Sequence, residues 1–160
     1  DLATELHLLS APERVRARPV VDVPGLPALP EMVVYPLTDQ IADKVCAMYG
    51  RYGLSQGPSS RYRDVLDLVL IVSTSEFDGR QLSLAIASES RRRDVALPRS
   101  MEAPGPNWEA GYAAIARRSR VASELRELSA ALRFVGACLD PILAGTFLGG
   151  SWHPDRGWSG

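Results

Sequence analysis

The stretch that decides the fold is Ser60-Arg61-Tyr62-Arg63-Asp64-Val65-Leu66-Asp67-Leu68-Val69-Leu70-Ile71-Val72-Ser73. Its apolar residues cover nearly all sides of a helix towards the end of the stretch, which predicts a central, buried helix over residues 60–73. Asp64 and Asp67 lie three positions apart on one face of this helix. A carboxylate in an apolar setting is costly unless it is compensated or used. The helix is therefore expected to carry both the core and a candidate site.

Helical signals continue on both sides of this stretch. Before it, Thr38 is the expected N-cap of a helix that ends at Gly50, and a loop over residues 51–60 follows. After it come three more predicted helices, which begin at Asp78, Asn107 and Ser123. The last is long and extends to about Val135, and Pro141 is expected to restart the chain as a turn.

The ends of the chain have a different character. Residues 1–35 are rich in proline and β-branched residues, and predict short strands at 2–9, 20–23 and 32–35 that form the edge of a sheet. Residues 36–148 are predicted to be a helical domain, and 149–160 a tail whose Trp152 and Trp158 pack locally or on a partner. The expected fold class is mainly α, a helical bundle with a short N-terminal β segment.

Composition excludes several classes of function. The formal net charge is −1 and the sequence pI about 6.2, so no global basic field attracts nucleic acid. The candidates for local contact with nucleic acid are two arginine clusters, Arg91 to Arg93 and Arg117, Arg118 and Arg120. Each cluster is explained equally well as the solvated end of a helix. The two histidines are isolated near opposite ends of the chain, which argues against a histidine-based zinc site.

Cysteine usage and hydropathy point to the cytoplasm. Cys46 and Cys138 each lie in an apolar helical stretch and are expected to be buried free thiols. No apolar run reaches about 18 residues and no signal-peptide pattern is present, so neither membrane insertion nor secretion is expected. The chain begins at Asp1 without an initiator methionine, and we expect it to be the later part of a longer protein.

Lys44 is the single lysine among 18 basic residues, and a GC-rich genome accounts for this scarcity. It lies beside the buried stripe that includes Ile41 and Met48, so its stem can pack while its ammonium reaches a cleft and meets a phosphate. If the two helices pack antiparallel, Lys44 and Asp64 approach each other. An ordinary salt bridge between the helices, with a second pair between Arg61 and Asp64, is the competing interpretation.

A family resemblance rests on two motifs. Tyr35 to Lys44 followed by Arg61 to Leu68 resembles the third and fourth motifs of the AbiEii/AbiGii toxin family, which are nucleotidyltransferases. In the third motif an aspartate, four residues and a lysine are matched by Asp39 and Lys44. The fourth is matched by Arg63, Asp64 and Asp67. Further matches in 108–112 and 134–143 extend the resemblance over roughly residues 30–145.

The resemblance implies a polymerase-β-type sheet, of which residues 1–35 are the edge, and an α+β fold for the whole protein. It implies that Lys44 contacts the phosphates of a nucleoside triphosphate (NTP) and steadies the leaving pyrophosphate. Asp64 then orients Lys44 or acts as general base, and Asp67 and Arg61 support them. Taken alone, Asp39 and Asp43 are interpreted as capping or solvated residues. The implied acceptor is RNA, tRNA ends being one known class, and the implied partner is a cognate antitoxin.

The chain departs from the family at its first motif. A glycine-rich turn followed by two aspartates that would hold magnesium is missing, and only Asp1 is a candidate remnant of the second motif. Residues 1–160 alone are therefore predicted to be inactive, because one carboxylate cannot hold two metal ions. Two alternatives stay open: a noncatalytic helical module that binds a partner through Trp108, Trp152 and Trp158, and a degenerate relative that has lost the chemistry.

Overall fold

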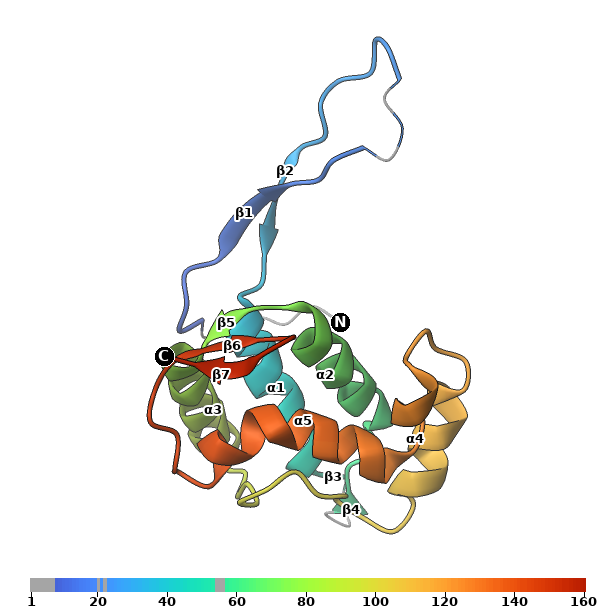
Figure 1. Ribbon diagram of the computed structural model, residues 1–160, viewed down its shortest axis with the longest axis vertical. Helices are drawn as coiled ribbons and strands as arrows, with labels where there is room; N and C mark the ends of the chain where they lie inside the picture. The colour runs from blue at the N-terminus through green and yellow to red at the C-terminus, as the bar shows by residue number, and fades with distance from the viewer. Residues whose placement is uncertain (1–7, 20, 22, 54–56) are drawn as a thin grey trace.

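The computed structural model describes residues 8–19, 21, 23–53 and 57–160. Figure 1 shows a body of packed helices and, projecting from it, a long two-stranded extension formed by the described residues between 11 and 35, here called the arm. The predicted strand at 2–9 and the candidate metal ligand Asp1 fall mostly or wholly outside the described residues. Among the described residues the chain is mainly α with small antiparallel sheets, as predicted.

Helices α1 (Leu37–Tyr49), α2 (Tyr62–Thr74) and α3 (Gly79–Arg93) pack side by side, with α1 between the other two. The prediction of a buried central helix is confirmed, because Val65, Leu68 and Val72 of α2 are fully buried. Asp78 caps α3 as expected, since its carboxylate accepts a hydrogen bond from the amide of Gln81 at 2.8 Å. Between α1 and α2 the chain forms a minimal hairpin of β3 (Arg51–Tyr52) and β4 (Gly57–Pro58).

Thr38 is not the N-cap of α1. The helix begins two residues earlier, with Pro36 at the cap position and no side chain capping it. Proline suits the start of a helix because its φ is already fixed near the helical value and it has no N–H to satisfy. The Thr38 hydroxyl is thereby free to bond elsewhere, and it lies 3.2 Å from the hydroxyl of Ser10.

The last helices also differ from expectation. Helix α4 (Trp108–Ala116) follows Asn107, which makes no capping side-chain bond, and Ser123 begins only a short 3-10 turn, Ser123–Leu125. The long helix α5 starts at Leu128, is preceded by Glu127, and runs through Pro141 to Leu143. Pro141 is tolerated in the last turn because the carbonyl it leaves unpaired belongs to the exposed Ala137 and can bind water.

The C-terminal segment folds onto the body. Strands β6 (Ser151–His153) and β7 (Gly157–Ser159) form a hairpin that pairs with β5 (Phe77–Asp78), so that Phe77 lies opposite Trp152. The indole N–H of Trp152 donates to the Val72 carbonyl at 2.9 Å, and that of Trp158 donates to the Cys138 carbonyl at 2.9 Å. Local packing of these tryptophans, one of the two predicted alternatives, is confirmed.

The arm is built on β1 (Glu13–Arg16) and β2 (Glu31–Val34), paired antiparallel. The strand β2 was predicted, whereas β1 was not, and the strand predicted at 20–23 does not form at the described residues 21 and 23. Pro19 and Pro24 flank that segment and cannot donate to a ladder. The register places Val15 opposite Met32 on one face, while Arg16 lies opposite Glu31 on the other.

The core of the body unites all five α-helices of the described part of the chain. Both cysteines are buried and free, as predicted, and burial raises the pKa of Cys46 to about 12. None of the helices in the described ranges combines the length and the hydrophobicity needed to span a bilayer.

Candidate functional site

Four charged side chains meet between α1 and α2. The Lys44 ammonium lies 2.6 Å from Asp67 Oδ2 and 3.6 Å from Asp64 Oδ1, and the Arg61 guanidinium donates to Asp64 Oδ2 at 2.6 Å. The predicted approach of Lys44 to Asp64 is thus confirmed. Here these four residues are called the charged network.

The four side chains of the charged network differ in how far they are exposed to solvent. The side chain of Asp64 is 6% exposed and that of Lys44 19%, whereas Asp67 and Arg61 are 33% and 52% exposed. The charges of two cationic and two anionic groups cancel. The buried carboxylate of Asp64 has a cationic partner at each of its two oxygens. The hydrogen bond to Asp64 raises the pKa of Arg61 above its usual range, although burial opposes this. The network therefore holds Lys44 at a protein surface with its charge satisfied but reachable.

The helical register explains how this arrangement forms. Ile41, Val45 and Met48 bury one stripe of α1 completely, and Lys44 emerges beside that stripe towards α2. On α2, Val65, Leu68 and Val69 face the core, so Asp64 at the first turn is drawn into it. An acidic residue in the first turn also faces the positive end of the helix dipole.

The other predicted site residues lie apart from the charged network. Arg63 is exposed and is not brought to the network by any described contact. Asp39 is 6% exposed and accepts a hydrogen bond from the Leu9 amide at 2.9 Å, so the interpretation as a solvated residue is wrong for it. Asp43 forms an ion pair with Arg93 of α3, which α1 contacts along much of its length.

Arg92 and Arg93 belong to a second charged cluster. Both donate to Glu89 within the last turns of α3, and Arg93 also reaches Asp43. Burial would raise the pKa of Glu89, but the hydrogen bonds from Arg92 and Arg93 lower it below its usual range. Glu89 was missed in the sequence, although its spacing of three and four residues from these arginines is a signal for helical ion pairs.

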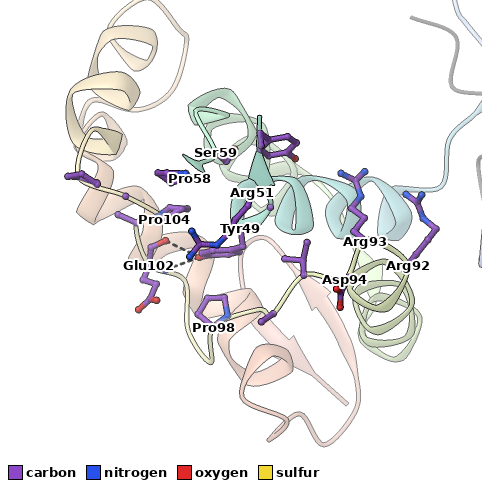
Figure 2. Close-up of a pocket in the computed structure, with 17 residues that line it drawn as sticks. Tyr49, Arg51, Pro58, Ser59, Arg92, Arg93, Asp94, Pro98, Glu102 and Pro104 are labelled. Carbon is purple, nitrogen blue, oxygen red and sulfur yellow. Dashed lines mark hydrogen bonds between the residues drawn. The ribbon is translucent and has the colours of Figure 1, made fainter. Parts of the chain in front are cut away.

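A groove of about 1070 Å³ opens next to this second cluster, between the end of α1, the β3–β4 hairpin and residues 95–106 (Figure 2). Tyr49 lies on its wall, where its hydroxyl bonds to the backbone of Glu102. The lining carries Arg51, Arg92 and Arg93, as well as the acidic residues Asp94 and Glu102. None of the four residues of the charged network lines the groove.

Of the three tryptophans that a binding module would use, Trp108 and Trp152 are buried and Trp158 is partly buried. Trp108 is 1% exposed and donates its indole N–H to the Ser59 carbonyl at 2.8 Å. Trp152 is 6% exposed, and Trp158 packs edge-on against it at a centroid distance of 5.5 Å. Trp108 and Trp152 are therefore not exposed to a partner, because this chain's own core covers both rings.

The described residues do not fit a metal centre. Among them, no three histidine, cysteine, aspartate or glutamate side chains converge in a way that could hold an ion. The two aspartates that lie nearest each other on α2 already face Lys44 and Arg61. Two-metal chemistry needs several free carboxylate oxygens.

Comparison with known families identifies the chain. The family model described as nucleotidyl transferase AbiEii toxin of a type IV toxin–antitoxin system matches residues 1–134. The chain belongs to the AbiEii nucleotidyl transferase toxin family. Neither curated proteins nor solved structures gave a match.

The AbiEii match confirms the resemblance seen in the two motifs and extends it to the start of the chain. It includes the arm, α1 to α4 and the first half of α5, while the β6–β7 hairpin lies beyond it. Membership places this protein among the toxins of type IV toxin–antitoxin systems. The charged network lies wholly within the matched residues.

Proposed function

We propose that this AbiEii family member takes part in transferring a nucleotide from an NTP to an RNA acceptor, of which tRNA ends are one class. The observation that supports this is the position of Lys44, whose ammonium is held between α1 and α2 by Asp67 at 2.6 Å and Asp64 at 3.6 Å. A compact, partly exposed ammonium that is already oriented suits a triphosphate.

In the proposed reaction, Lys44 exchanges its contact with the more exposed Asp67 for phosphate oxygens. The acceptor hydroxyl oxygen forms a bond to the α-phosphorus, the bond to pyrophosphate breaks, and Lys44 offsets the negative charge on the leaving group. Asp64 stays anchored by Arg61 at 2.6 Å. From there it keeps Lys44 oriented or accepts the proton of the acceptor hydroxyl.

We expect magnesium to be required, and its ligands to come from outside the described residues, since these offer no acidic cluster. Residues 1–160 by themselves are therefore expected to transfer nothing. The cognate antitoxin of the system is expected to relieve the effect of transfer in cells.

The test is Lys44→Ala in the intact toxin, assayed for transfer of labelled nucleotides to total tRNA and for growth inhibition. We expect transfer to fall by about 100-fold or more, because removing one charged contact to a transition state has effects of this size. Lys44→Arg keeps the charge but not the compact shape and should recover little of the activity.

Arg80→Ala is the matched control, because Arg80 is an exposed cation on α3 away from the charged network. It should transfer as well as the wild type, and all three variants should show the wild-type far-UV circular dichroism. If Lys44→Ala transfers nucleotide at the wild-type rate, the role proposed for Lys44 is wrong.

A further inference from the structure

Three consecutive residues in the first turn of α1 hold both ends of the arm. Where the chain leaves the body, the Leu9 amide donates to Asp39 Oδ1 at 2.9 Å, and the hydroxyls of Ser10 and Thr38 lie 3.2 Å apart. Where the chain returns, the Gln40 side-chain amide donates to the Tyr35 carbonyl at 3.3 Å. Thr38, Asp39 and Gln40 are here called the clamp.

The clamp residues Thr38 and Asp39 are buried, unlike the residues of an ordinary surface contact. Asp39 is 6% and Thr38 is 5% exposed, and both contact residues that lie about 30 positions earlier in the chain. The positive end of the α1 dipole stabilises a carboxylate at the position of Asp39. A hydrogen bond to a charged acceptor is stronger than one between neutral groups.

Burial of Asp39 also has a cost. Its second carboxylate oxygen is buried, and no described group forms a hydrogen bond with it. An alanine or an apolar residue would avoid this cost but could not bind the Leu9 amide. An aspartate at position 39 is therefore explained by the need to bind the backbone amide of Leu9.

We propose that Asp39 is a positioning residue that fixes Leu9 and the arm relative to Lys44. Asp39 and Lys44 lie five positions apart on one rigid helix, so whatever Asp39 holds keeps a set distance from the charged network. This inference rests on the proposed function, in which Lys44 has to be held in a fixed position relative to the rest of the nucleotidyltransferase. The aspartate of the motif then acts through the backbone of Leu9 and touches no substrate.

The test compares Asp39→Ala with Asp39→Asn, since asparagine keeps an acceptor oxygen for the Leu9 amide and removes the charge. Amide hydrogen exchange at Leu9, followed by NMR in the 160-residue chain, should speed up by about tenfold or more in Asp39→Ala and stay near wild type in Asp39→Asn. In the intact toxin, transfer should fall in Asp39→Ala and recover in Asp39→Asn.

Ser10→Ala provides a milder variant should Asp39→Ala fail to fold, because it removes one clamp contact from outside the helix. It should speed exchange at Leu9 by a smaller factor. Unchanged exchange at Leu9 in Asp39→Ala would overturn the clamp. Protected Leu9 but lost transfer in Asp39→Asn would overturn the positioning role, because the charge itself would then be needed.

Lys44→Ala separates this inference from the proposed function. It should abolish transfer and leave exchange at Leu9 as in the wild type. A toxin that transfers normally without Lys44 contradicts the proposed function alone, because the exchange measurement reports the clamp independently of transfer.

Discussion

Asp64 is the residue on which the charged network depends. Its two oxygens serve different partners, with Oδ2 bonded to Arg61 at 2.6 Å and Oδ1 at 3.6 Å from Lys44. Because its side chain is almost fully buried, each contact replaces water that the carboxylate has lost. Asp67 approaches Lys44 more closely but keeps a third of its side chain in water.

Replacing Asp64 should therefore cost more stability than replacing Asp67. Asp64→Ala is expected to lower the free energy of unfolding by about 1–3 kcal/mol, since Lys44 and Arg61 both lose a buried acceptor. Asp67→Ala should lower it by less than about 1 kcal/mol, because Asp67 is partly exposed and water can replace its contact with Lys44. Urea unfolding of both variants at neutral pH measures the difference, and equal losses would contradict this ranking.

The positions of individual site residues could be predicted from the sequence where their contacts are set within one helix. The spacing of Asp64 and Asp67 predicted that they share one face of an apolar helix and that Lys44 approaches Asp64, and in the structure Lys44 contacts both. Asp39 could not be read in the same way, because its burial depends on Leu9, which lies outside α1. A motif spacing also placed Arg63 with the site, yet its position on the helix turns it to solvent.

Among the elements, Tyr49 joins the end of α1 to the loop over residues 95–106. Its hydroxyl donates to the Glu102 carbonyl at 2.9 Å and accepts from the Glu102 amide at 3.0 Å. Burial, only partly offset by the backbone hydrogen bond from Glu102, raises the pKa of Tyr49 from 10.0 to about 12. The folded state thus prefers the protonated phenol more strongly than the unfolded state does.

This shift predicts an alkaline loss of stability. The contribution of Tyr49 is complete below pH 10, the value for the unfolded chain, and is lost as the pH rises towards about 12. Tyr49→Phe should therefore show a shallower decline than the wild type when unfolding free energies are measured across this range. Some decline will remain, since burial also raises the pKa of Tyr112 to about 12. Identical slopes for the two proteins would contradict the assignment to Tyr49.

Elements could be predicted wherever a local signal defines them. Asp78 began α3 as its capping chemistry suggested, and the apolar face of α2 was evident from its period. Strand β1 was missed because Glu13-Arg14-Val15-Arg16 is mostly charged and becomes a strand only by pairing with β2. Ser123 was a plausible cap, but the chain makes one 3-10 turn there and restarts at Leu128.

At the scale of the whole molecule, the arm and the body bury their apolar residues very differently. The body has a continuous core, whereas many of the large apolar residues left exposed belong to the arm, among them Val21, Leu26 and Val33. On the face opposite the Arg16–Glu31 ion pair, Val15, Met32 and Val34 line up along the ribbon. The clamp thus joins a helical body to a ribbon that has no core of its own.

The C-terminal hairpin, in contrast, is part of the body. Gly79 at the start of α3 donates its amide to the Gly150 carbonyl at 2.9 Å, and a Cβ at Gly79 would lie only 2.2 Å from the Phe147 ring. Trp158 contacts Phe147, Phe77 and Trp152, so the hairpin closes an aromatic cluster against α3 and α5. Such an arrangement should unfold together with the helices.

Trp152→Ala tests this cooperativity. Trp152 is 6% exposed and bonds to the Val72 carbonyl, so its removal should lower the free energy of unfolding by about 3–5 kcal/mol in one transition. Leu148→Ala is the control, because Leu148 is 99% exposed and should change stability by less than about 0.5 kcal/mol. Chemical denaturation followed by both circular dichroism and tryptophan fluorescence measures this. A detachable hairpin would instead lose its fluorescence signal first and leave the helical transition of Trp152→Ala at the wild-type midpoint.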